Sequence, residues 1–144
     1  VTGLADRETY TFWEHYFGAS PHKTHEEAWF LMQTRWMLWM EEGSTLRLLP
    51  GVSRRWLEPG HTIELEDVRT YFGPVSLRVV SHGRRMEADI EFHCPERTPE
   101  RMHLGMPHPD GRHAVEVEGG EYVAATETVI VRNPDGRAQV TVRF

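Results

Sequence analysis

The residues best suited to bind a metal ion are two histidines and a carboxylate, His22, His25 and Glu26. A zinc-binding His-Glu-x-x-His helix places its two histidines one turn apart, so that both project from the same face. Here His22 precedes the expected helix start at Thr24, and only His25 and Glu26 share the first turn. The sequence therefore predicts no metal site. Two other interpretations stay open: polar decoration of a helix entry, and contact with a substrate.

Nucleophilic and acid–base catalysis find little support in the sequence. There is no Gly-x-Ser-x-Gly turn, and Cys94 precedes Pro95 without a helix N-terminus that would activate its thiol. Glycoside hydrolysis needs two carboxyl groups about 5–10 Å apart, yet no pair stands out among the 22 acidic residues. We predict no catalytic residue and no cofactor in this chain.

Aromatic side chains give a stronger signal. Flat aromatic rings pack against the C–H faces of sugars, so an aromatic-rich rim is compatible with glycan binding. For Trp36 and Trp39 the competing interpretation, burial in a core, is favoured. The aromatic residues that exceed the needs of a small β-domain are Trp13, Trp29, Trp36, Trp39, Trp56, Tyr71 and Phe72.

Composition narrows the class of protein. The chain has 144 residues, of which 39% are hydrophobic and 26% charged, as in soluble globular domains. A net charge of -6 argues against nucleic-acid binding, which normally requires a basic surface. No apolar run reaches the length of about 18 residues that a membrane span needs. One cysteine excludes an internal disulfide and leaves the compartment open.

The clearest helix signal covers residues 24–42. Thr24 and Glu27 have capping-box spacing, and Gly43 suits the left-handed residue that ends many helices. Between these ends, apolar side chains point in nearly every direction around the predicted helix, which indicates burial on most sides. A preceding stretch, 5–17, is expected to be an amphipathic helix that covers one side. The uncovered remainder predicts self-association through the 24–42 helix.

After Gly43 the apolar period changes from helical to two, which is typical of strands. Met86, Ala88, Ile90 and Phe92 alternate with charged or polar residues, and Pro-Gly, Asp-Gly and Gly-Gly turns separate about eight such strands. The predicted fold is mainly β. A helical segment over 1–43 is followed by an antiparallel β-sandwich over 44–144.

Several runs resemble one known pattern. They are LRLLPGVSRRWLEPG at 46–60, TYFGPVS at 70–76, EAWFLM at 27–32 and HPDG at 108–111. Together they resemble the junction between a helical barrel and its C-terminal β-domain in large bacterial (α/α)6-type glycoside hydrolases, particularly the α-L-rhamnosidase-like ones. The resemblance covers most of residues 24–120, and its motifs are structural.

The resemblance implies that the 24–42 helix is the last inner helix of a barrel formed by upstream sequence. It places His22, His25 and Glu26 near the rim of the glycan cleft as substrate contacts, and the catalytic acids upstream. The parent protein would be a glycoside hydrolase, compatible with secretion or a periplasmic location.

The leading prediction is thus a C-terminal accessory region of a carbohydrate-active enzyme, one that supports the barrel and helps line its cleft. One alternative is a carbohydrate-binding module that contacts glycan through Trp56, Tyr71 or Phe72. The other is a structural module that assembles through its Trp/Met-rich helix.

Overall fold

The computed structural model describes residues 5–6, 11–12, 24–94 and 96–144. The chain divides into two compact units, Val1–Met37 and Leu38–Phe144. In the first unit, strands β1 (Ala5–Asp6) and β2 (Thr11–Phe12) pair antiparallel. The predicted helix over 5–17 is therefore wrong at these residues. Helix α1 (Thr24–Leu38) begins where the capping pattern predicted.

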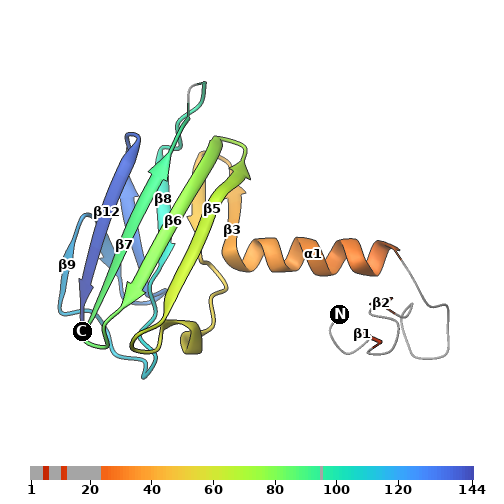
Figure 1. Ribbon diagram of the computed structural model, residues 1–144. Coiled ribbons are helices and arrows are strands. Elements are labelled where there is room, and N and C mark those ends of the chain that lie inside the picture. Colours follow the sequence, from red (N-terminus) through yellow and green to blue (C-terminus); the bar gives the residue numbers. More distant parts are fainter. Residues whose placement is uncertain (1–4, 7–10, 13–23, 95) are drawn as a thin grey trace. The chain divides into compact units, whose positions relative to one another are not determined.

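The second unit is a sandwich of two five-stranded sheets (Figure 1). One sheet has the order β10-β11-β8-β4-β3 and the other β5-β6-β7-β12-β9. All neighbours pair antiparallel except β4 and β8, which are parallel. The strands are β3 (Trp39–Glu42), β4 (Thr45–Leu48), β5 (Thr62–Thr70), β6 (Gly73–Ser81), β7 (Arg85–Phe92), β8 (Arg101–Gly105), β9 (Glu116–Glu118), β10 (Glu121–Val123), β11 (Thr128–Arg132) and β12 (Arg137–Arg143). The predicted mainly β fold, a helix followed by a sandwich, is confirmed.

The predicted end of the helix was wrong. The helix stops at Leu38, and the next four residues form β3, which pairs antiparallel with β4. Gly43 is left-handed (φ 59°), as expected, but it turns the β3–β4 hairpin instead of capping a helix. Trp39 packs against the sandwich core, so burial and ladder hydrogen bonds outweigh the local helical pattern. The unit boundary accordingly falls before Leu38, whereas the sequence placed it after Gly43.

Alternating residues of the two sheets build the core. In β7 the predicted inward set of Met86, Ala88, Ile90 and Phe92 is buried, while Glu91 faces solvent. Leu46 and Leu48 of β4 and Met102 and Leu104 of β8 face them from the opposite sheet and are also buried. One continuous cluster therefore joins both sheets.

Contacts between edge strands close one side of the sandwich. The Trp39 indole Nε1–H donates to the Arg69 carbonyl oxygen over 3.3 Å. The Tyr71 backbone N–H donates to the Glu41 carboxylate over 3.0 Å. Strand β3 is thereby tied to β5 and its following turn, on the other sheet. No helix among the described residues is long and apolar enough to cross a membrane.

Candidate functional site

Three segments meet at the end of the sandwich where the chain also ends (Figure 1). They are the 3₁₀ helix η2 (Arg54–Leu57) with its turn into β5, the β6–β7 turn, and the loop between β8 and β9. The first two are directly hydrogen-bonded: the Gly60 N–H donates to the Ser81 carbonyl over 2.8 Å, and the Ser81 N–H to the His61 carbonyl over 3.0 Å. The buried Ser81 hydroxyl donates to the Leu57 carbonyl over 2.7 Å. The three segments are hereafter called the frame, and these hydrogen bonds connect the first two of them.

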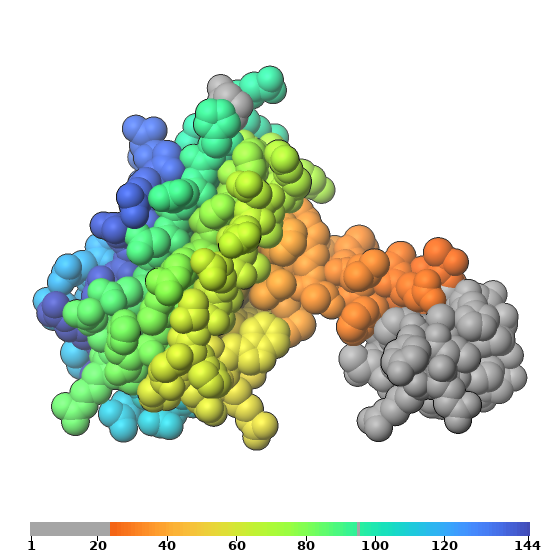
Figure 2. Space-filling model, in the orientation of Figure 1, coloured from red at the N-terminus to blue at the C-terminus, as the bar shows by residue number. Residues whose placement is uncertain are grey.

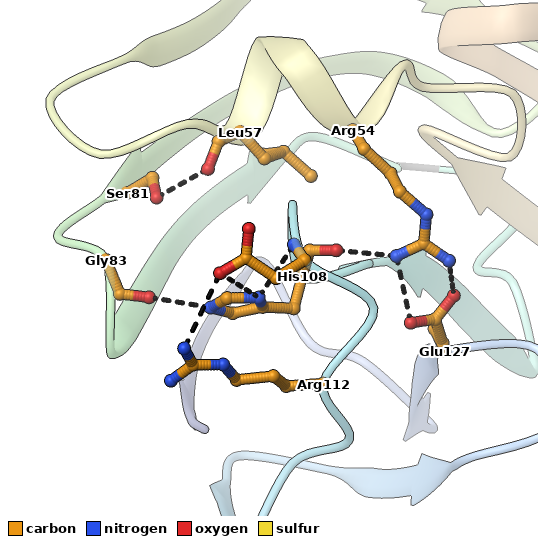
Figure 3. Close-up of polar contacts among 8 residues, drawn as sticks. Arg54, Leu57, Ser81, Gly83, His108, Arg112 and Glu127 are labelled. Atoms are coloured by element: carbon orange, nitrogen blue, oxygen red, sulfur yellow. Dashed lines mark hydrogen bonds and ion pairs between the residues drawn. The ribbon is translucent and has the colours of Figure 1, made fainter.

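His108 joins the β8–β9 loop to the β6–β7 turn (Figure 3). Its ring is buried, at 5% exposure, and lies 4.7 Å from the Phe144 ring between centroids. Nδ1 accepts the Asp110 N–H over 3.0 Å, and Nε2 lies 3.2 Å from the Gly83 carbonyl oxygen. Because a carbonyl only accepts, Nε2 carries the proton and the ring is the neutral tautomer. Gly83 is left-handed (φ 81°), a conformation that glycine adopts without strain.

Arg54 ties η2 to the same loop from the other side (Figure 3). Its guanidinium donates a hydrogen bond to the His108 carbonyl oxygen over 2.5 Å. It also donates to both carboxylate oxygens of Glu127. The hydrogen bond to Glu127 raises the pKa of Arg54 above its ordinary value. Arg54 and Ser81 thus hold η2 at both of its ends.

Trp56 projects from this clamped η2 turn. The backbone N–H of Trp56 donates to the Ser53 carbonyl oxygen over 2.9 Å, and the residue is 43% exposed. The ring borders an open hollow of about 550 Å³, hereafter the first hollow, which is also lined by Gly60, His61, Thr62 and Ile63. The yellow η2–β5 segment forms part of the surface seen in Figure 2. The lining thus combines an aromatic, an imidazole and a hydroxyl side chain.

A second hollow is lined in part by residues of the 58–60 turn. It measures about 610 Å³, and its lining includes Glu58, Pro59, His82, Arg84, His108, Asp110 and Arg112. The Arg112 guanidinium lies 3.6 Å from the Asp110 carboxylate. Pro59 borders this hollow and Gly60 borders the first, so the 58–60 turn contributes to the lining of both.

The sandwich does not bring the sequence-predicted aromatic residues together. Trp56 precedes β5 and Tyr71 follows it, and a nine-residue strand spans about 30 Å. Tyr71 is 74% exposed. Phe72 is 3% exposed and belongs to the core, with the Arg97 guanidinium 5.5 Å above its ring, so the expectation of an exposed contact there was wrong.

The other predicted residues belong to α1. His25 Nε2 lies 3.2 Å from the Glu26 carboxylate, and Glu26 is buried. Trp29 is 47% exposed and meets Trp36 edge-on, with 6.4 Å between ring centroids. His22 lies outside the described residues. Among those described, no three His, Cys, Asp or Glu side chains are placed to hold a metal ion.

Sequence reasoning missed the frame around His108. The His-Pro-Asp-Gly run does suit a ring nitrogen that accepts the Asp110 N–H two residues on. The Arg54–Glu127 pair joins positions 73 apart in the chain, and no local spacing could have indicated it.

No protein family, curated protein or solved structure matches this chain. Functional conclusions therefore depend on the side chains that the chain places at this site. The frame holds one aromatic face, guanidinium and imidazole donors, and carboxylate acceptors at a solvent-open surface. Such a set suits a ligand that carries both C–H faces and many hydroxyl groups.

Proposed function

We propose that the sandwich is an accessory glycan-binding domain of a carbohydrate-active protein, with Trp56 as its stacking platform. The observation that carries this proposal is a half-exposed indole, on a turn that hydrogen bonds hold at both ends, beside an open hollow that His61 and Thr62 also line. The negative face of an indole attracts the C–H groups of a sugar ring. Hydroxyl groups at the sugar edge would meet His61 and Thr62.

Rigidity of the platform favours affinity, because a ligand need not bear the entropy cost of ordering it. Leu57, the residue after Trp56, is 1% exposed and accepts the Ser81 hydroxyl hydrogen bond. On its other side, Arg54 holds Glu127 and the loop at His108. The Trp56 backbone is thus fixed from both directions, while its ring stays open to solvent.

A second role concerns α1, which we assign to packing against the upstream helical barrel of the same protein. Its exposed large apolar side chains support this: Trp29, Leu31, Met32, Trp36 and Met37 are 37–67% exposed. So many apolar groups on one helix are typical of a surface that packs against protein. The resemblance to (α/α)6-type glycoside hydrolases leads to the same role.

Titration calorimetry with Trp56→Ala tests the glycan proposal. The ligands are a panel of neutral and acidic oligosaccharides. We expect Trp56→Ala to weaken the tightest binding by at least about ten-fold, as for loss of a buried aromatic contact. Tyr71→Ala is the matched control, since it removes another exposed ring at the far end of β5. Equal binding by Trp56→Ala and the wild-type protein would contradict the proposal.

A further inference from the structure

We infer, on the basis of the proposed glycan site, that the second hollow selects sugars bearing a carboxylate group. Arg84 and Arg112 line this hollow, and each guanidinium offers paired N–H donors that match the two oxygens of a carboxylate. A uronic acid is the ligand class that combines such a group with a ring able to stack on Trp56.

Arg84 differs from most arginines of the sandwich in its charge environment. Most of the others have a carboxylate within 4.0 Å, as in the pairs Arg47–Glu42, Arg54–Glu127, Arg78–Glu64, Arg85–Glu87, Arg132–Glu121, Arg137–Asp89 and Arg143–Glu116. In the part of the chain that the structure describes, Arg84 has no such partner, a property that it shares with Arg55, Arg69, Arg97 and Arg101; of these five, it alone lines the second hollow. Acidic residues outnumber basic ones, 22 to 16, so a shortage of acidic residues does not explain why Arg84 lacks a partner. The Arg84 guanidinium is available to an anion.

Arg112 is held only loosely by its own carboxylate. It lies 3.6 Å from Asp110, and the two side chains are 56% and 69% exposed. An exposed pair of this kind contributes little stability. A ligand carboxylate can therefore take the place of Asp110 at small cost, and the Asp110 and Glu58 oxygens then accept hydrogen bonds from sugar hydroxyls.

The buried His108 links the two backbone segments that carry the arginines. Its Nε2–H bond to the Gly83 carbonyl anchors the turn that carries Arg84, and its Nδ1 anchors Asp110, two residues before Arg112. Both cations therefore project from one hydrogen-bonded frame. The turn from Glu58 to Gly60, which contributes to both hollows, spans at most about 7 Å. An oligosaccharide stacked on Trp56 can thus cross Pro59 and present its carboxylate to the arginines.

The test compares a tetragalacturonate with its fully methyl-esterified counterpart, which keeps the rings and loses the charge. We expect the wild-type protein to bind the acid at least about ten-fold more tightly than the ester, as for a charge-assisted bidentate contact. Arg84→Gln combined with Arg112→Gln should remove this difference by weakening acid binding much more than ester binding. Arg132→Gln, on the opposite sheet, matches the sign of the charge change and should keep the preference. Thermal melts check that each variant is folded.

The outcomes separate this inference from the proposed function. Equal binding of acid and ester overturns the carboxylate preference and leaves glycan binding standing. Binding of neutral oligosaccharides alone overturns it as well. A loss in Arg132→Gln as large as in the double variant would assign the effect to overall charge and also overturn it. Failure of every oligosaccharide in the panel to bind would contradict both proposals.

Discussion

Trp56 and the pair Trp29–Trp36 are all exposed tryptophans, yet their surroundings differ. Trp56 stands alone on a turn that hydrogen bonds hold at both ends, beside imidazole and hydroxyl groups. Trp29 and Trp36 pack edge-on against each other on a helix with three other exposed large apolar side chains. The first setting suits a small polar ligand, and the second suits a protein surface. Exposure of an aromatic ring does not by itself identify its partner.

The largest effect is expected in the sandwich core, the cluster to which Leu57 of the η2 turn also belongs. Ile90 is fully buried between the sheets, so Ile90→Ala should lower the free energy of unfolding by about 2–5 kcal/mol. Urea denaturation measures this change in the free energy of unfolding. Glu91→Ala is the control on the next residue. Its side chain is 66% exposed, and the change should be below about 0.5 kcal/mol. Equal losses would mean that β7 is not the one-sided strand described above.

A smaller loss is expected at His108. His108→Ala leaves the Gly83 carbonyl and the Asp110 N–H without their partner and should lower the free energy of unfolding by about 1–3 kcal/mol. The same variant should reduce acid-over-ester preference, because the arginines lose their common anchor. His113→Ala, on an exposed loop residue, is the matched control. Unchanged stability and preference in His108→Ala would show that the frame does not depend on this ring.

His103 gives the sandwich a pH-dependent contribution. Burial, together with the nearby charges of Arg47 and Arg101, lowers the pKa of His103 below its ordinary value. The unfolded chain then binds the proton more readily, so stability is lost as pH falls below about 6.5 and levels off below the folded-state pKa. Thermal melts at pH 7 and pH 5 should show a smaller acid-induced loss in His103→Gln than in the wild-type protein. Identical losses would contradict the assignment.

The helix should affect association far more than sandwich stability. Light scattering after size exclusion is expected to show self-association of the 144-residue chain. Replacing Trp29 and Trp36 with Gln should make it more monomeric, with less than about 0.5 kcal/mol effect on sandwich unfolding. Trp39→Gln is a different case, because Trp39 packs on the sandwich core and its loss should destabilise the fold. A wild-type chain that stays monomeric at high concentration would remove the support for a helix-packing surface.

Sequence reasoning succeeded where a single local pattern determines the outcome. The alternation through Met86, Ala88, Ile90 and Phe92 predicts a half-buried strand, and each of the four is buried. It failed at Trp39–Glu42, where pairing with β4 overrides a helical pattern that continues through the segment. Trp56 was predicted as a contact, but nothing local could show that Arg54 reaches Glu127 or that His108 reaches Gly83. These long-range bonds create the site.

Nuclear magnetic resonance of the tryptophan indole N–H groups tests the central claim most directly. The chain has five tryptophans, and Trp56→Ala identifies the signal of Trp56 by its absence. Titrating tetragalacturonate, or any neutral oligosaccharide that binds more tightly, should shift the Trp56 signal first and most. The signals of Trp29 and Trp36 should stay in place. A ligand that shifts the helix tryptophans and leaves Trp56 unmoved would contradict the assignment of glycan binding to the η2 end of the sandwich.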